Sequence, residues 1–213
     1  MTDSHRELKG LILSGGKGSR LRPFTYTGAK QLVPIANKPI LFYALESLAE
    51  AGVRRVGIVV GDTREQVMAA VGDGSHFGLE VTYIEQPAPL GIAQAVKISE
   101  GFLGSDPFVL YLGDNFLRGG IVPFAEEFRR SSPQCLIMLR RVPNPQDFGV
   151  ARLVDGRVAG VVEKPKEPPQ RPGRHRHIHV RPAGLRGCQQ HQALGPRRAG
   201  DHRHNPVPNR QRL

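Results

Sequence analysis

The stretch LSGGKGSRLRP, residues 13–23, joins an apolar run to a loop rich in glycine and arginine. The apolar residues 8–14 end in glycines, a pattern typical of a buried strand. The three glycines within residues 15–18 allow backbone N–H groups to turn toward an anion, and Arg20 adds a permanent positive charge. The spacing is not that of a Walker A loop, nor of GxGxxG, because Leu21 stands where the third glycine would be. These residues alone leave two interpretations open, an anion-binding loop and an ordinary strand-to-loop turn.

The rest of the body alternates strand-like and helix-like segments. We expect strands at residues 8–14, 54–60, 79–85, 108–112 and 135–141, a hairpin of 150–154 with 157–162, and helices at 40–51, 64–71, 92–102 and 122–130. Thr63 is a candidate cap for the second helix, and Cys135 is expected to be a small core residue. The alternation predicts an α/β fold with a Rossmann-like, mostly parallel sheet and helices on both faces. Ligands bind such sheets at the carboxyl ends of the strands, where the glycine loop and residues 113–115 both fall.

Charge divides the chain into two parts. Residues 1–169 contain 20 Lys and Arg against 18 Asp and Glu, whereas residues 170–213 contain ten Arg, no Lys and one acidic residue. The overall net charge of +11 therefore does not by itself indicate a nucleic-acid-binding body. The two cysteines form no metal-binding spacing, and the N-terminal residues contain no long apolar run. A reducing, cytoplasmic setting without a membrane anchor fits these features.

Several short motifs follow the glycine loop in a fixed order. GGKGSRLRPFT is followed by KQLVP, by NKPI, and later by EQPAPLGIAQAV at residues 85–96 and EKP at residues 163–165. Together these motifs resemble the sugar-nucleotide nucleotidyltransferases, and most closely the members that use dTTP and glucose 1-phosphate. The resemblance covers about residues 8–169 and implies a glycosyltransferase-A-like nucleotidyltransferase fold, incomplete at the C-terminus. The one departure in the first motif is Ser19, where the family usually has Thr; the hydroxyl group is kept.

The resemblance implies a role for each matching residue. Arg20, Lys30 and Asp114 would be catalytic, with Asp114 as a ligand of Mg²⁺, the implied cofactor. The implied nucleotide-binding residues are Gly15, Gly16, Gly18, Ser19, Arg20, Gln31, Gln86 and Gly91. The implied sugar-phosphate-binding residues are Asn115, Gly149, Glu163 and Lys164. Without the resemblance, Lys30 could be a surface lysine, Asp114 a solvated turn residue, Gln86 part of a proline-rich turn, and the EKP segment a charged linker.

The implied reaction is nucleotidyl transfer. An oxygen of glucose 1-phosphate would attack the α-phosphorus of dTTP and release pyrophosphate. The nucleophile is already an anion, so no general base is required, and catalysis consists of positioning and charge neutralisation. UTP or another hexose 1-phosphate remains an alternative, as does a non-catalytic nucleotide-binding regulator. The expected partners are small-molecule substrates rather than a membrane or nucleic acid, and homo-oligomer formation is left open.

Residues 170–213 differ in kind from the rest of the chain. They contain six of the eight histidines and too few apolar residues for a core, so we expect a disordered tail. We interpret this tail as the product of a reading-frame shift in GC-rich DNA. Codons can be chosen for residues 195–212 so that a start one nucleotide later encodes GRGELEITDTIQYLIDRG, which has helical spacing and resembles the family at this depth. On this hypothesis the nucleotidyltransferase domain, residues 1–169, is incomplete and its turnover impaired; the alternative is a genuine basic tail that binds nucleic acid or another polyanion.

Overall fold

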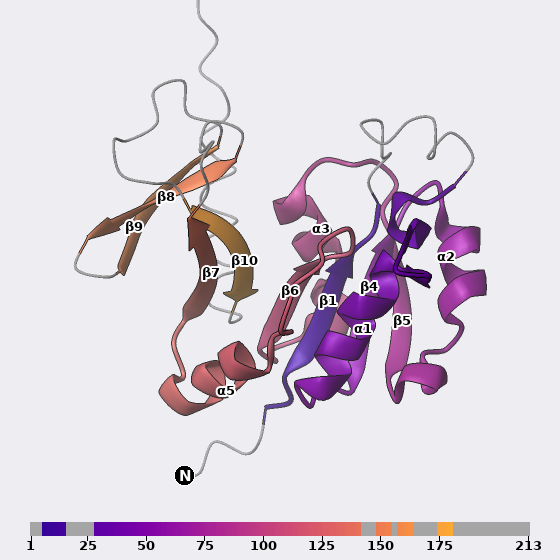
Figure 1. The fold of residues 1–213 in the computed structure, drawn as a ribbon, viewed down its shortest axis with the longest axis horizontal. Coiled ribbons are helices and arrows are strands. Elements are labelled where there is room, and N and C mark those ends of the chain that lie inside the picture. Colours follow the sequence, from indigo (N-terminus) through magenta and orange to yellow (C-terminus); the bar gives the residue numbers. More distant parts are fainter. Residues whose placement is uncertain (1–5, 16–27, 142–147, 155–156, 164–173, 181–213) are drawn as a thin grey trace, which may run out of the picture.

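The computed structural model describes residues 6–15, 28–141, 148–154, 157–163 and 174–180, and its centre is a six-stranded sheet (Figure 1). The strand order is β5-β4-β1-β6-β10-β7. The bounds are β1 Lys9–Leu13, β4 Arg55–Val60, β5 Glu80–Glu85, β6 Phe108–Leu112, β7 Cys135–Arg141 and β10 Arg174–Val180. Strands β5, β4, β1 and β6 pair in parallel, and β10 is antiparallel to both of its neighbours. The predicted mostly parallel sheet is confirmed.

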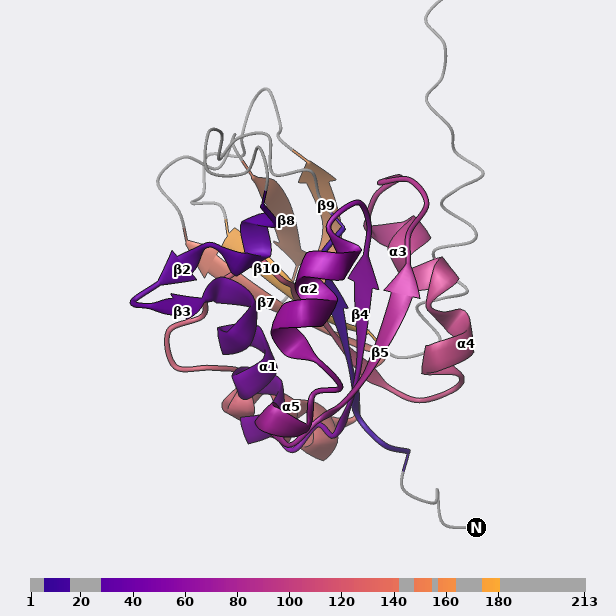
Figure 2. The ribbon, with the colours of Figure 1, turned by 90° about the vertical axis from the view of Figure 1, so that its right-hand side faces the viewer.

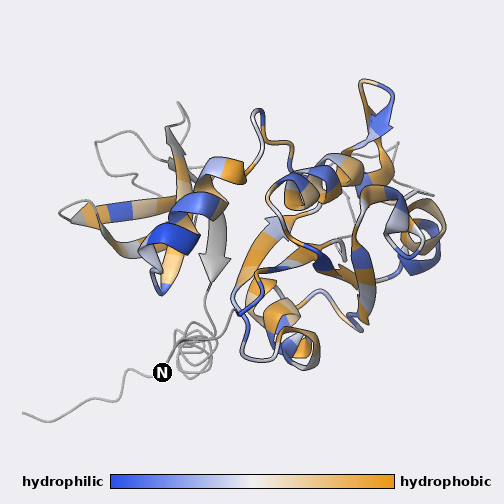
Figure 3. Ribbon diagram, turned by 90° about the horizontal axis from the view of Figure 1, so that it is seen from below, coloured by the Kyte–Doolittle hydropathy of each residue, from blue (hydrophilic) through white to orange (hydrophobic). Residues whose placement is uncertain are grey.

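Helices cover both faces of this sheet, as predicted (Figure 2). Their bounds are α1 Ile40–Glu50, α2 Arg64–Val71, α3 Ile92–Ile98, α4 Glu100–Leu103 and α5 Val122–Ser131. Neighbouring strand residues point to opposite faces, so Ile12 packs in the core with α1, α2 and α5, whereas Leu11 packs with α3 and α4. The central strands are therefore apolar on both sides, and Figure 3 shows them as predominantly hydrophobic.

Two short hairpins complete the described fold. Strands β8 (Gly149–Val154) and β9 (Arg157–Glu163) pair antiparallel, which confirms the hairpin predicted there. Strands β2 (Pro34–Ile35) and β3 (Lys38–Pro39) form a second hairpin that the sequence did not predict. Its turn residues Ala36 and Asn37 both have positive φ, a conformation that Asn tolerates better than Ala. This hairpin follows a 3₁₀ turn, η2 (Lys30–Leu32), and so fixes the start of α1 relative to Lys30.

Three local expectations differ from the structure. The helix expected at residues 92–102 is divided at Ser99, whose hydroxyl donates to the Ala95 carbonyl oxygen at 2.7 Å. Thr63 precedes α2 but makes no side-chain capping bond, because its backbone is not in the extended region that an N-cap normally adopts. Cys135 is exposed rather than in the core, because it is the first residue of the edge strand β7.

Strand β10 is the main addition to the predicted elements. The sequence composition suggested no strand after β9, yet the backbone of residues 174–180 pairs with seven residues of β7 and three of β6. A strand needs only backbone partners on its two sides, and β6 and β7 supply both. The remaining residues of the predicted tail, 170–173 and 181–213, lie outside the described residues, so the proposed domain boundary at residue 169 stays a prediction.

Candidate functional site

The candidate site lies at the carboxyl ends of the four parallel strands, which meet at one edge of the sheet (Figure 1). Backbone hydrogen bonds continue past the strand ends and hold the following residues together. The Ser14 N–H donates to the Val59 carbonyl at 2.8 Å, and the Gly113 N–H donates to the Leu13 carbonyl at 3.0 Å. The Gln86 N–H donates to the Val60 carbonyl at 2.8 Å. The segments that follow β1, β4, β5 and β6 are therefore fixed relative to one another.

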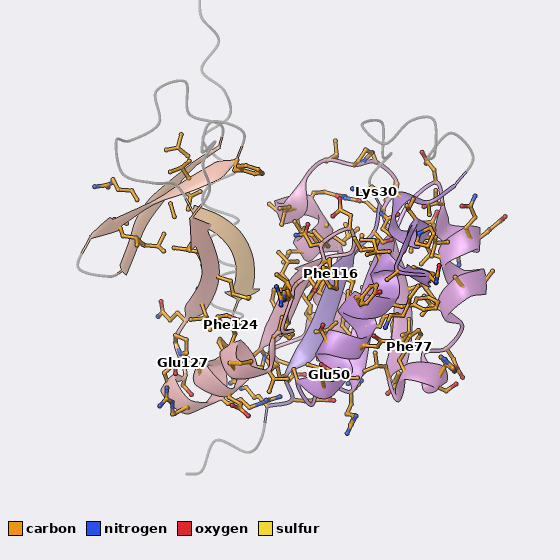
Figure 4. The ribbon with its side chains drawn as sticks, in the orientation of Figure 1. Lys30, Glu50, Phe77, Phe116, Phe124 and Glu127 are labelled. Carbon is orange, nitrogen blue, oxygen red and sulfur yellow. The ribbon has the colours of Figure 1, made fainter. Side chains whose placement is uncertain are left out.

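Two predicted catalytic residues, Lys30 and Asp114, form an ion pair at this edge. The Lys30 Nζ lies 2.5 Å from the Asp114 Oδ2, and the two side chains are 21% and 37% exposed. Lys30, labelled in Figure 4, is the first residue of η2. Asp114 follows β6, so the fold joins positions 84 residues apart. The pair presents a cation and a carboxylate, both open to solvent, at the place where the strands end. The third predicted catalytic residue, Arg20, lies outside the described residues.

Gln31 is buried, unlike its neighbour Lys30, which is partly exposed. The Gln31 side chain is fully buried, and its Nε2 donates to the Ser14 carbonyl oxygen at 2.7 Å. Among the described residues, neither its Oε1 nor the buried Ser14 hydroxyl has a hydrogen-bond partner. Gln31 thus links the segment that carries Lys30 to the end of β1. Its predicted contact with the nucleotide stays a prediction, and the observed contact is a structural one.

Gln86 lies where β5 ends, beside the start of the glycine loop. Its Nε2 donates to the Gln94 Oε1 at 2.6 Å. A Cβ atom added to Gly15 would stand only 2.5 Å from the Gln86 Oε1, so Gly15 leaves the space that this amide fills. Gly91, which precedes α3, has a φ of 97°, a backbone conformation that residues with a side chain rarely adopt. The structure therefore brings Gly15 and Gln86 together and gives Gly91 a backbone role.

The other predicted residues fall into two groups. The Asn115 N–H donates to the Leu112 carbonyl at 2.9 Å, which places this residue in the turn with Asp114. Gly149 begins β8 and pairs in register with Glu163 of β9. Five other predicted residues, Gly16, Gly18, Ser19, Arg20 and Lys164, lie outside the described residues, and so does the side chain of Glu163.

Sequence analysis missed Gly61 and Gln94, and it placed Gly113 at a strand end without giving that residue a role of its own. Gly61 follows β4, and an added Cβ there would stand 3.3 Å from the Gly15 carbonyl oxygen. An added Cβ on Gly113 would stand 3.1 Å from the Leu13 carbonyl oxygen. Gln94 holds the Gln86 amide. The two glycines carried a readable signal, since each directly follows a buried strand, whereas the Gln94 contact depends on how α3 packs.

A metal at this site would rely on Asp114. The described residues contain no group of three or more His, Cys, Asp or Glu side chains able to hold a metal ion. Mg²⁺ does not need such a cage, because it commonly binds through one or two carboxylates together with substrate phosphates and water. In the core, burial raises the pKa of Tyr111 on β6 to about 12, so its phenol is neutral at physiological pH.

The arrangement and the sequence both match a known family. The model for the family described as nucleotidyl transferase matches residues 9–179. The chain belongs to this nucleotidyl transferase family. A glucose-1-phosphate thymidylyltransferase of Streptomyces griseus is 57% identical over 162 residues, which are 76% of this chain and 46% of that protein. A low-salt glycan biosynthesis nucleotidyltransferase of Haloferax volcanii is 51% identical over 164 residues, with the same coverage of each chain.

Solved structures of nucleotidyl transferases share the fold. A Bacillus anthracis protein described as a glucose-1-phosphate thymidylyltransferase, in complex with sucrose, matches with a TM-score of 0.79 and 33% identity. That match covers 89% of this chain and 76% of the other. A UDP-glucose pyrophosphorylase complexed with UDP-glucose matches with a TM-score of 0.73 at 21% identity, which supports the fold alone.

Two further findings concern the length of the chain and its helices. This chain spans about half the length of the curated nucleotidyl transferases named above. Within the described residues, no helix is long and apolar enough to cross a membrane.

Proposed function

We propose that this nucleotidyl transferase chain transfers a thymidylyl group from dTTP to glucose 1-phosphate, with Mg²⁺ as cofactor. The observation that carries the proposal is the Lys30–Asp114 ion pair, 2.5 Å long, at the same sheet edge as Gly15 and Gln86. The triphosphate would need a cation and backbone N–H groups free of side chains, the metal would need a carboxylate, and the base would need an amide. The 57% identity to a thymidylyltransferase favours dTTP over UTP.

The proposed reaction exchanges one P–O bond for another. An anionic phosphate oxygen of glucose 1-phosphate attacks the α-phosphorus of dTTP, the bond from that phosphorus to the bridging oxygen breaks, and pyrophosphate leaves. No proton must be removed from the nucleophile at neutral pH. The protein's task is to hold two polyanions in line and to offset their charge.

Each described residue has a distinct part in this proposal. Lys30 supplies a compact positive charge to the phosphates once it separates from Asp114. Asp114 would hold Mg²⁺, which when bound offsets the charge of the phosphate oxygens. Gln86 would contact the base, since an amide offers both a donor and an acceptor. Asn115, Gly149, Glu163 and Lys164 remain the candidates for the sugar phosphate.

The test separates nucleotide binding from turnover. Isothermal titration measures the dTTP affinity of the purified protein, and a coupled assay measures pyrophosphate release with glucose 1-phosphate and Mg²⁺. We expect Lys30→Met and Asp114→Asn each to lower pyrophosphate release by roughly 10²–10³-fold, the range seen when a charge-stabilising group is removed. Neither substitution should change the free energy of unfolding by more than about 1 kcal/mol, because the ion pair is partly exposed.

Two comparisons sharpen the result. Lys30→Arg keeps the charge and should keep more nucleotide affinity than Lys30→Met, while UTP in place of dTTP tests the alternative substrate. If the wild-type protein bound no nucleoside triphosphate, the proposal would be wrong. Unchanged turnover in Asp114→Asn would show that Asp114 is not the metal ligand.

A further inference from the structure

Lys30 lies on a very short element. The 3₁₀ turn η2 (Lys30–Leu32) has three residues, and no side chain caps its N-terminus. Two backbone bonds belong to the turn: the Leu32 N–H donates to the Ala29 carbonyl at 2.9 Å, and the Val33 N–H donates to the Lys30 carbonyl at 3.3 Å. Hydrogen bonds in 3₁₀ turns have poorer geometry than those of α-helices. The position of the Lys30 backbone therefore depends on contacts between this turn and neighbouring elements.

Two glutamine side chains supply such contacts, one on each side of Lys30. After Lys30, the Gln31 Nε2 donates to the Ser14 carbonyl oxygen at 2.7 Å, which joins the turn to the end of β1. Before Lys30, the Ala29 N–H donates to the Gln66 Oε1 at 2.8 Å, which joins the turn to α2. Ala29 is buried, so its N–H needs an acceptor. Lys30 thus lies between two residues that are held to different elements of the fold.

The bond between Ala29 and Gln66 has a defined direction. A backbone N–H can only donate, so the oxygen of the Gln66 amide must face Ala29. Gln66 is exposed on α2, and its side chain fills no place in the core. A substitution at position 66 therefore removes the acceptor without leaving a cavity in the core.

We propose that Gln66 is a positioning residue for Lys30: by accepting a hydrogen bond from the Ala29 N–H, it holds η2 where the Lys30 ammonium meets the phosphates of dTTP. The inference rests on the proposed function, in which Lys30 offsets phosphate charge. Gln66 acts only through Lys30 and not by touching the nucleotide. Without an acceptor at position 66, returning Lys30 to its place reduces the binding free energy of dTTP by up to the value of one net hydrogen bond.

Substitutions on α2 test whether the acceptor at position 66 matters. In Gln66→Leu the acceptor is lost, and the dTTP affinity falls roughly three- to tenfold. Gln66→Glu keeps an acceptor but adds a negative charge, so it is combined with Glu65→Gln, which restores the net charge of α2. This charge-neutral double variant should retain the wild-type affinity. Ala69→Leu adds a leucine at another exposed position of α2, and as the matched control it should leave the affinity unchanged.

The measurement is the dissociation constant of dTTP for each variant of the full chain, by isothermal titration with Mg²⁺ present. Thermal unfolding of each variant shows whether the fold is intact. A double-mutant cycle with Lys30→Met then separates positioning of Lys30 from a general loosening of the fold. Because Lys30→Met removes the group that is to be positioned, adding Gln66→Leu to it should lower the dTTP affinity no further.

The possible results have distinct meanings. Unchanged affinity in Gln66→Leu would overturn the inference, and so would a loss of the same size in the charge-neutral double variant. A loss that persisted in full when Lys30→Met was already present would also overturn it, since Gln66 would then act by another route. The proposed function would stand in each of these cases. A wild-type protein that did not bind dTTP at all would instead overturn the proposed function, and this inference with it.

Discussion

Replacing Gln31 tests whether this fully buried side chain supports the site or contacts the nucleotide. Gln31→Met keeps a similar volume but removes the Nε2 that donates to the Ser14 carbonyl at 2.7 Å. Leaving a buried polar group without its partner costs about 1–3 kcal/mol. Part of that cost is offset, because the substitution also removes the Gln31 Oε1, which is buried without a partner among the described residues. We expect the free energy of unfolding to fall by about 1–2 kcal/mol.

Gln31→Glu gives a larger effect that depends on pH. An ionised carboxylate at this buried position cannot donate to the Ser14 carbonyl, and burial raises its pKa above the unfolded value of about 4.3. The raised folded-state pKa means that stability is fully present below the unfolded pKa and is lost as the pH rises toward the folded one. The destabilisation by Gln31→Glu should therefore be several kcal/mol at pH 8 and clearly smaller at pH 5.

Urea unfolding at the two pH values measures these differences, and dTTP titration of Gln31→Met completes the test. If Gln31 supports the site, Gln31→Met loses stability and dTTP affinity together. A variant of wild-type stability that had lost dTTP affinity would instead show a direct contact with the nucleotide. Equal stability of Gln31→Met and Gln31→Glu at pH 8 would refute the reasoning, since it would mean that the side chain is not buried.

Two further predictions concern residues away from the site. Gly57→Ala should destabilise the protein by about 1–3 kcal/mol in urea unfolding, because its Cβ would stand 2.9 Å from the Phe102 ring. The control Gly101→Ala on α4, where an added Cβ meets nothing within 4 Å, should stabilise it by about 0.5–1 kcal/mol; the opposite order would contradict the packing described. Hydrogen bonds from Ser75, chiefly from its side chain, lower the pKa of Asp73. In an NMR titration Ser75→Ala should raise that pKa toward 3.8, and an unchanged value would exclude the side-chain bond.

The regular part of the fold was predictable because its signals are local. Buried strands such as β1 and β6 are apolar on both faces and end in glycine, and α1 has helical spacing up to Gly52. The division of a predicted helix at Ser99, whose hydroxyl donates to the Ala95 carbonyl oxygen, is not revealed by helical spacing. Strand β10 was missed because composition describes side chains, whereas β10 joins the sheet through backbone pairing.

The sequence indicated which charged residues lie at this end of the sheet, but not the contacts that support them. Lys30 was proposed from its motif and Asp114 from its place after a buried strand within the family match, and the fold brings the two side chains together; their catalytic roles stay predictions. The burial of Gln31 and the contact between Gln86 and Gln94 depend on packing across elements, which a single sequence does not specify. In the KQLVP motif, Lys30 is therefore partly exposed while its neighbour Gln31 lies in the interior.

The contact between Gln86 and Gln94 spans only eight positions, all within the connection from β5 into α3. The ion pair of Lys30 and Asp114 instead joins segments 84 positions apart. Gln86, the residue proposed to contact the base, and the Gln94 amide bonded to it therefore lie on one short, contiguous segment, separate from the charged pair proposed to act on the phosphates. We expect an exchange of residues 86–94 between nucleotidyl transferases to leave the Lys30–Asp114 pair in place, because neither of its residues lies in that segment.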